Sequence, residues 1–154
     1  MTTITLLTTI NAPIERCFDL SWSIDLHLSS TVHTSEKAIA GKTSGLINKG
    51  ETVTWEAIHF GIKQQLTSII TEMIPPLFFS DKMVKGAFKS MYHEHHFEYT
   101  EGATLMKDIF TYDTPLGLMG KLFDLLVLER YMRQLLLTRN AFIKKIAEGH
   151  TTDV

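Results

Sequence analysis

The sequence predicts an α+β fold in which a curved antiparallel sheet of seven strands, in meander order, wraps around one long C-terminal helix. The first observation is an apolar periodicity between about residues 117 and 147, with the spacings of three, four and seven that are typical of one helix face. The periodic side chains are Leu118, Leu122, Leu125, Leu128, Met132, Leu135, Phe142 and Ile146. The second observation is a series of short alternating segments upstream, separated by turn signals. A long helix is marginally stable alone, so we expect these segments to form the surface on which it lies.

The N-terminal part of the chain predicts one strand followed by two short helices. Residues 3–11 are rich in β-branched side chains, and the even-numbered residues from 4 to 10 fall on one face. Asn11 is expected to cap the first helix, with Pro13 in its first turn. The second short helix is expected over about residues 23–29.

The middle of the chain predicts a meander, because tight turns join alternating segments and short connections make neighbouring strands antiparallel. The expected turns contain glycine or proline at positions 60–61, 75–76 and 101–102. The expected strands are 36–41, 51–59, 62–74, 77–84, 91–99 and 103–113. Counting outward from the turns gives the expected cross-strand neighbours Trp55 and Leu66, Ala57 and Gln64, Phe97 and Met106, and His95 and Asp108.

The inner face of this sheet is too polar for an ordinary interface between a sheet and a helix. Each buried polar group without a partner costs about 1–3 kcal/mol, so these groups must pair with one another, meet water or face a bound molecule. We expect a cavity that binds a partly polar ligand. The residues predicted to bind it are Trp55, His59, Gln64, Leu66, Ser68, Asp81, Met83, His93, His95, Phe97, Met106, Asp108, Phe110, Tyr112, Leu125 and Met132.

Histidines and aspartates on the inner face suggest two further kinds of chemistry. His93 and His95 have the alternate-residue spacing of metal ligands in a strand, and His59 and Asp108 fall on the same face. We nevertheless expect a polar network without a metal, in which Asp108 orients His95. A histidine held by a carboxylate could also act as a general base. The sequence shows no nucleophile–base–orienter set and no phosphate-binding loop, so we assign no catalytic residue and no cofactor.

The C-terminal helix raises a separate question, because its first half is apolar on nearly every side. The two short helices and neighbouring loops could bury it; otherwise it forms the mouth of the cavity, a dimer interface or a membrane-docking patch. In the second half, Arg139 and Asn140 fall nearer the sheet, where Arg139 could pair with an inner carboxylate.

Composition sets the broad class of protein. The chain has 154 residues, 44% of them hydrophobic and 21% charged, and we expect a single domain over residues 1–154. A net charge of −2 gives no general attraction to nucleic acid. The single cysteine, Cys17, favours a reducing compartment. We expect no signal peptide and no transmembrane segment, and hence a cytoplasmic protein.

The order of elements resembles the helix-grip fold of the START-like, or SRPBCC, superfamily, which includes the major birch pollen allergen, lipid-transfer domains and polyketide cyclases. Residues 10–20, INAPIERCFDL, are similar to the start of that superfamily's domains. Further segments resemble a bacterial cyclase-like subgroup: residues 50–57 (GETVTWEA), 59–61 (HFG), 66–68 (LTS), 81–88 (DKMVKGAF), 93–98 (HEHHFE), 106–108 (MKD), 112–117 (YDTPLG), 130–133 (RYMR) and 139–140 (RN). The resemblance covers residues 3–147.

This resemblance implies a hydrophobic cavity between sheet and helix and a small ligand of lipid, isoprenoid or aromatic type. Binding, transport or sensing of that ligand is the expected function. An enzyme of cyclase, aromatase or hydrolase type and a protein-interaction module are the alternatives, with a homodimer or a partner protein left open. The resemblance carries over no catalytic residue.

Overall fold

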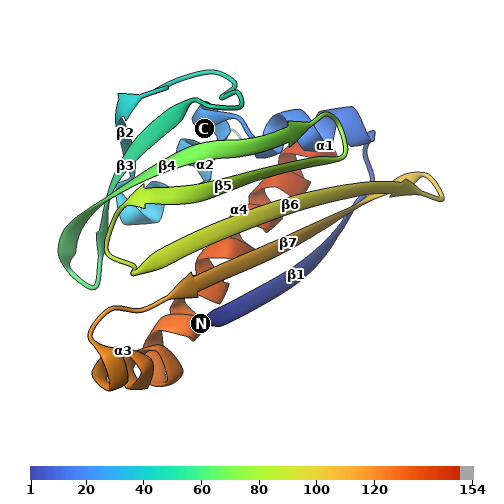
Figure 1. The fold of residues 1–154 in the computed structure, drawn as a ribbon. Helices are drawn as coiled ribbons and strands as arrows, with labels where there is room; N and C mark the ends of the chain where they lie inside the picture. The colour runs from blue at the N-terminus through green and yellow to red at the C-terminus, as the bar shows by residue number, and fades with distance from the viewer. Residues whose placement is uncertain (150–154) are drawn as a thin grey trace.

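A computed structural model describes residues 1–149 and shows seven antiparallel strands curved around a long C-terminal helix (Figure 1). The strands are β1 (Thr2–Ile10), β2 (Lys37–Gly41), β3 (Thr52–His59), β4 (Ile62–Ile74), β5 (Phe78–Lys85), β6 (Ser90–Thr100) and β7 (Ala103–Asp113). The helices are α1 (Ile14–Ser21), α2 (Ile24–Ser30), the 3₁₀ turn η1 (Val32–Thr34), α3 (Gly117–Phe123), the π-helical turn η2 (Asp124–Leu128) and α4 (Glu129–Ala147). The predicted fold class is therefore confirmed.

The sheet has the order β1-β7-β6-β5-β4-β3-β2, so β2 to β7 form the predicted meander and β1 closes the far edge against β7. The predicted register is also confirmed. Trp55 lies opposite Leu66 in β3 and β4, and His95 lies opposite Asp108 in β6 and β7. The predicted pairs Ala57–Gln64 and Phe97–Met106 lie opposite each other as well.

Two tight hairpin turns fix this register. Phe60 and Gly61 connect β3 to β4, and Glu101 and Gly102 connect β6 to β7. All four residues have positive φ angles between 53° and 81°. Two consecutive left-handed residues match the right-handed twist of the flanking strands, which is why such turns favour glycine at the second position. The inward and outward faces of β3, β4, β6 and β7 therefore follow directly from the position of each turn.

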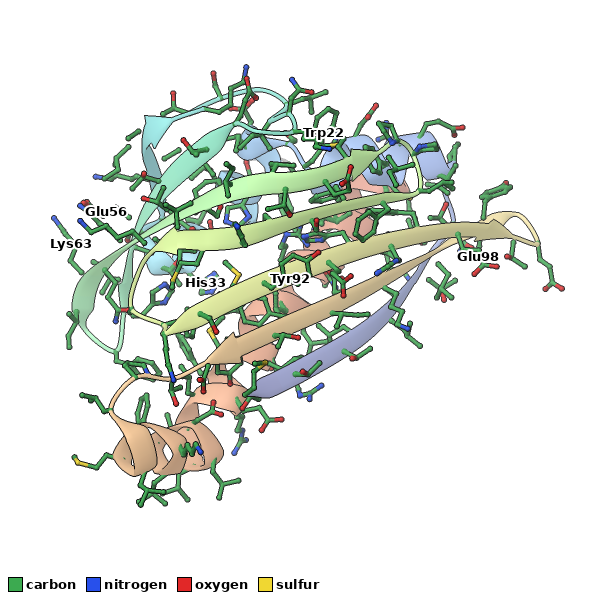
Figure 2. All side chains as sticks on the ribbon, in the orientation of Figure 1. Trp22, His33, Glu56, Lys63, Tyr92 and Glu98 are labelled. Atoms are coloured by element: carbon green, nitrogen blue, oxygen red, sulfur yellow. The ribbon has the colours of Figure 1, made fainter. Side chains whose placement is uncertain are left out.

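Many outward side chains of the sheet are polar, as the alternation predicts. At the β3–β4 end, Glu56 and Lys63 form an ion pair of 3.6 Å on the outside of the molecule (Figure 2). Gln65 donates to the other oxygen of the Glu56 carboxylate at 3.0 Å. Such exposed pairs add little stability, so their main effect is to keep this face solvated.

The two short helices form where they were expected, although the cap of the first is different. Helix α1 begins at Ile14 with Pro13 in the cap position, so the prediction that Asn11 caps it is wrong. The backbone N–H of Asn11 instead donates to Glu148 Oε1 at 2.9 Å, which ties the end of β1 to the end of α4. Helix α2 starts with a side-chain cap, because Ser23 Oγ accepts from the backbone N–H of Leu26.

The C-terminal helix contains a wider turn near its start that the sequence did not predict. In η2 the side chain of Asp124 is buried and accepts hydrogen bonds from the hydroxyls of Tyr112 and Thr2. These contacts fasten the helix to β1 and β7 at this point. A π-helical turn rotates the residues on either side of it relative to each other. The apolar stripe before η2 is therefore not continuous with the stripe after it.

As a result, the predicted buried face of the helix is wrong for its first half. Leu118 and Leu125 are 84% and 75% exposed, and α3 extends beyond the end of the sheet (Figure 1). In α4 the buried positions are Leu136, Arg139, Asn140, Ile143 and Ala147. The short helices α1 and α2 do not bury α3, because they pack on α4 at the other end of the molecule.

The core divides along the length of α4. At one end, Ile143 and Ala147 pack with Phe18 of α1 and with Phe97 and Met106 of the sheet. Nearer η2, a second cluster contains Ile4, Leu6, Met91, Phe110, Tyr112 and Leu136. A third cluster, Ile24, Ile47, Val53 and Ile70, contributes to the walls of the candidate site. Within the described residues, no helix is long and apolar enough to cross a membrane.

Candidate functional site

A pocket of about 590 Å³ lies between the concave face of the sheet and α4. Its walls come from β3 to β7, α2, α4 and the segment 114–120. The lining is mostly apolar and includes the aromatic side chains of Trp22, Trp55, Phe60, Phe79, Phe88, Phe110, Phe123 and Tyr131. This volume lies within the range of roughly 300–1,000 Å³ found for small-molecule sites.

Ten of the residues predicted to bind a ligand line this pocket. They come from five adjacent strands and from α4, which shows that the inner face was assigned to the right side of the sheet. The ten are Trp55, His59, Gln64, Leu66, Ser68, Asp81, His93, His95, Phe110 and Met132.

The other predicted residues do not line the pocket, for reasons that the alternation of a strand cannot show. Phe97 and Met106 face inward, but α1 covers that end of the sheet and they form core contacts with Phe18. Tyr112 is buried in the core at the opposite end, where its hydroxyl binds Asp124.

The predicted residues Met83, Asp108 and Leu125 also lie outside the pocket lining. The side chain of Met83 packs beside Leu66 in the second core cluster. Asp108 is fully buried behind the histidines of β6 and does not reach the pocket. Leu125 is exposed because η2 turns it away from the sheet.

The polar part of the pocket wall consists of Asp81, His93 and His95, with Asp108 behind them. One oxygen of Asp108, Oδ1, lies 3.0 Å from His93 Nε2 and 3.0 Å from His95 Nδ1. Only the contact to His93 has the geometry of a hydrogen bond, and His95 Nδ1 is a buried nitrogen without a hydrogen-bond partner among the described residues. His95 Nε2 lies 3.3 Å from Asp81 Oδ1. His95 and Asp108 face each other at 3.0 Å, as the sequence suggested, and Asp108 also has a hydrogen bond with His93 that was not expected.

Two side chains of α4 complete this network from the helix side. Asn140 Nδ2 donates to the second oxygen of Asp108 at 2.7 Å. The guanidinium of Arg139 lies 3.7 Å from Asp108 Oδ1 and donates to the backbone oxygen of Ser21 at 2.7 Å. The expectation that Arg139 lies near the sheet and pairs with an inner carboxylate is confirmed. Arg139 also lines the pocket, so the network joins α4 to β5, β6 and β7.

The electrostatics of the network follow from burial and from these contacts. Burial, together with the adjacent His95 ring, lowers the pKa of His93 to about 4 despite the bond to Asp108. Burial alone would raise the pKa of Asp108, but the neighbouring His93 and His95 hold it well below its usual range. The pKa of Asp81 is lowered in the same way: burial opposes the shift, and the bond from His95 and the charges nearby outweigh it. At neutral pH the site therefore holds two carboxylates and a neutral His93.

His59 belongs to a second polar group rather than to this network. His59 Nδ1 lies 2.7 Å from the hydroxyl of Tyr131 on α4. In the same part of the pocket, His27 Nε2 contacts Glu36 Oε1 at 3.2 Å, and the His27 ring packs on Trp55. His59 on β3 and His95 on β6 are three strands apart, which separates these two side chains by roughly 14 Å across the sheet.

Sequence reasoning missed the pocket residues that come from outside the meander. His27 lines the pocket from α2, Thr31 from the junction of α2 and η1, Glu36 from just before β2, and Tyr131 from α4. No periodic signal marks them, because they lie in short elements or at element ends. Glu36 lies just before an edge strand, where an acidic side chain is normally exposed. Its side chain is only 12% exposed, so its position in the sequence gave no signal for the pocket.

The exposed apolar segment around α3 borders the pocket. Leu116, Met119 and Phe123 line the pocket and are also largely exposed to solvent. Phe123 packs edge-on against Phe60 of the β3–β4 turn. The apolar first half of the C-terminal helix is therefore next to the pocket, on the side where it meets solvent.

Comparisons with known proteins support the architecture. No family model matches the sequence, and no curated protein matches it. Among solved structures, the di-domain ARO/CYC StfQ from the steffimycin biosynthetic pathway has a TM-score of 0.76 at 11% identity, over 95% of this chain and 50% of that one. The chain has the helix-grip fold. TTHA0849 from Thermus thermophilus gives a TM-score of 0.72 at 17% identity, over 92% and 97% of the two chains. The Aha1 dimer from Colwellia psychrerythraea gives 0.66 at 13% identity, over 99% and 100%.

At these identities the likeness shows the helix-grip fold alone. It confirms the order of elements that the sequence resemblance implied, from the first strand through the two short helices and the meander to the long helix. What the chain binds or transforms depends on its own pocket.

Proposed function

We propose that this helix-grip chain acts as one ligand-binding domain. Its ligand is a small hydrophobic molecule of lipid, isoprenoid or aromatic type that carries a polar end. The observation that supports this most directly is the pocket of about 590 Å³, whose apolar walls enclose a buried cluster of ionisable side chains. A protein without a ligand gains more stability by closing such a space with apolar side chains, because unfilled volume forfeits dispersion contacts.

The contacts of the pocket suggest how the ligand lies in it. Its polar end faces Asp81, His93, His95 and Arg139, where donors and acceptors converge on one part of the wall. Its apolar body lies along the aromatic and aliphatic side chains of β3, β4 and α4. Entry is through the mouth beside Phe123, where apolar side chains already meet solvent. Few polar groups within a mostly apolar lining is the usual pattern of a specific small-molecule site.

An enzyme of cyclase or aromatase type is the second candidate. It is favoured by the position of His93 and His95, two imidazoles held by carboxylates at the wall of a pocket that admits a substrate. The likeness in fold to the ARO/CYC StfQ agrees with this candidate but does not carry it. Turnover of a poly-oxygenated aromatic precursor, lost on changing His95 to glutamine, would favour the enzyme; tight binding without turnover favours the binding protein.

The primary test is native mass spectrometry of freshly purified protein, because an apolar pocket often retains its occupant. We expect an adduct of a few hundred daltons that organic extraction removes. A fluorescent apolar probe, 1-anilinonaphthalene-8-sulfonate, then reports binding to the extracted protein. The extracted molecule should displace the probe.

A pair of variants on one strand locates the binding. Ser68 is buried and lines the pocket, whereas its neighbour Thr67 points to the other face of β4. Ser68→Phe should fill the pocket and abolish the adduct and probe binding, while Thr67→Phe should leave both unchanged. Phenylalanine is well tolerated in strands, so both variants should fold. Equal probe binding by the two variants, or no adduct and no probe binding in the unmodified protein, would overturn the proposal.

A further inference from the structure

His95 poses a problem of hydrogen bonding that its protein neighbours do not solve. Its two ring nitrogens each face a carboxylate oxygen: Nε2 faces Asp81 at 3.3 Å and Nδ1 faces Asp108 at 3.0 Å. A neutral imidazole carries one proton, so whichever tautomer forms, one nitrogen directs a lone pair at a negatively charged oxygen. The side chain is buried and stacked on Phe79 with ring centroids 4.0 Å apart, so rotation away from the carboxylates is restricted.

A cation between His95 Nε2 and Asp81 removes this conflict. The Nε2 lone pair and the Asp81 oxygen would both point at the cation, and Nδ1 would carry the proton toward Asp108. Two ligands of one tetrahedral metal ion, at about 2.0–2.2 Å each, lie roughly 3.4 Å apart. The observed 3.3 Å between His95 Nε2 and Asp81 Oδ1 matches that spacing.

His93 supplies a third ligand of the same kind. Its Nε2 is bonded to Asp108, which leaves Nδ1 as the nitrogen that is free to ligate. Candidate ligand atoms of Asp81, His93 and His95 all lie within 4.8 Å of one another. Asp108 lies behind both imidazoles, in the place of the outer carboxylate that commonly orients metal-bound histidines.

The charge of the cluster points in the same direction. The cluster contains two negatively charged carboxylates, Asp81 and Asp108. Within residues 1–149, one guanidinium, that of Arg139, contacts it, so negative charge exceeds that of the guanidinium. A buried negative charge is costly unless it is paired or coordinates a metal. Two histidines and one carboxylate form a donor set typical of divalent transition metals, and the side facing the pocket stays open for a further ligand.

We propose that Asp81, His93 and His95 bind one divalent transition metal ion of the zinc class, with Asp108 orienting both histidines. This site departs from the metal-free network expected from the sequence, which paired His95 with Asp108 and considered Asp81 only as a partner of the histidines in an enzyme. It does not depend on which organic ligand the pocket takes, because its ligands come from the protein alone.

The test uses Co²⁺ as a spectroscopic probe and Zn²⁺ as its competitor. The purified protein is treated with a chelator, desalted and titrated with Co²⁺ while the visible spectrum is recorded. We expect saturation at one ion per chain, with visible bands that Zn²⁺ abolishes. X-ray absorption at the zinc edge should then show nitrogen and oxygen neighbours at about 2.0–2.2 Å and no sulfur.

Two variants separate this site from adventitious binding. Asp81→Asn keeps the size of the side chain and should weaken Co²⁺ binding by more than the roughly 10–100-fold typical of losing an outer partner. The matched control is His96→Asn, on the outer face of the same sheet, where His96 lies 3.8 Å from Glu94 and could hold an ion at the surface. The control should bind Co²⁺ as the unmodified protein does.

Three results would overturn the proposal. The first is no Co²⁺ or Zn²⁺ binding below about 100 μM, with nuclear magnetic resonance showing His95 protonated on both nitrogens, since a proton resolves the same conflict. The second is binding that His96→Asn removes and Asp81→Asn does not. The third is an X-ray absorption spectrum of the unmodified protein without imidazole neighbours, a measurement that does not require any variant to fold.

Discussion

Replacing Asp108 with alanine should lower the free energy of unfolding by about 3–5 kcal/mol, because it breaks a buried charged network by removing one partner. The carboxylate is fully buried and accepts hydrogen bonds from His93 Nε2 at 3.0 Å and Asn140 Nδ2 at 2.7 Å. Arg139 lies 3.7 Å away and would keep its charge in a buried place without this partner. Each of the two hydrogen bonds to the charged carboxylate contributes about 1.5–3 kcal/mol. Alanine also removes the cost of desolvating the carboxylate, which offsets part of this loss, so the net effect stays within the same range of about 3–5 kcal/mol.

Urea denaturation followed by circular dichroism measures this change, with the slope of the transition compared between variants. The control is Glu94→Ala, an outward residue of β6, which should stay within about 0.5 kcal/mol of the unmodified protein. If Asp108→Ala lowers the free energy of unfolding by less than about 1 kcal/mol with an unchanged slope, the network does not hold the helix to the sheet.

Double-mutant cycles show which histidine is the partner of Asp108. The geometry gives the hydrogen bond to His93, whereas cross-strand pairing in the sequence suggested His95. We expect a coupling energy of about 1.5–3 kcal/mol between Asp108→Ala and His93→Ala, and a smaller one with His95→Ala. Equal couplings for the two histidines would show that the shared oxygen does not distinguish between them.

Three further predictions concern other parts of the molecule. Burial raises the pKa of Glu36, but the contacts with His27 and Thr31 lower it overall, so its ionised form stabilises the fold. Glu36→Gln should therefore lower the free energy of unfolding by about 1–3 kcal/mol at pH 7, a difference that shrinks as pH falls below the ordinary value of 4.5. Gly120→Ala should lower the free energy of unfolding by about 1–3 kcal/mol, because a Cβ would lie 1.8 Å from the backbone oxygen of Pro115. Leu125→Ser should change it by less than about 0.5 kcal/mol, since this side chain is exposed.

Each of these has a control and a contrary outcome. For Glu36→Gln the control is Glu51→Gln, and a deficit that is the same at pH 7 and pH 3.5 would contradict the charge argument. For Gly120→Ala the comparison is Gly86→Ala, where the nearest atoms belong to flexible side chains of Leu66 and Met83 that can move. A large loss of stability in Leu125→Ser would show that α3 and η2 are covered in solution.

The sheet was predictable because the sequence of each strand and turn indicates which residues face inward and how neighbouring strands pair. Alternation fixes the two faces of a strand, and a hairpin with glycine at its second turn position fixes how it pairs with the next. The pair His95 and Asp108 followed from one turn at residues 101 and 102 alone. A slip of a single residue would have exchanged the faces, so the correct pairing of Trp55 with Leu66 tests the assignment of β3 and β4.

The C-terminal helix was harder to predict, because its periodicity spans a π-helical turn. Counting from Leu118 at 3.6 residues per turn carries the stripe through η2 without the rotation that an added residue introduces. The turn depends on Asp124 reaching the hydroxyls of Tyr112 and Thr2, which are far away in the sequence. A long-range contact of this kind leaves no local pattern, so the sequence placed Leu125 at the pocket and the structure places it in solvent.

The site shows the same division. The inward face of the sheet gave Asp81, His93 and His95, but alternation does not say how far along a strand the pocket extends. Phe97 lies outside the pocket because α1 covers it, and the position of α1 depends on its packing against α4. The second polar group, with Glu36 and Tyr131, depends on long-range packing that no local periodicity in the sequence indicates.

The final prediction asks whether the pocket-facing charges serve the fold or the site. Asp81 and His95 are each other's partners, and Asp108 keeps its bonds to His93 and Asn140 when both are replaced. Each single change, Asp81→Val or His95→Phe, strands one polar group and should cost about 1–3 kcal/mol. The double change strands none, so its stability should equal or exceed that of the unmodified protein by up to roughly 4 kcal/mol, as replacing a buried ion pair often does. Co²⁺ binding should be lost in the double variant. If denaturant melts show the double variant to be less stable than either single one, the pair stabilises the fold and the argument that apolar residues can replace it is refuted.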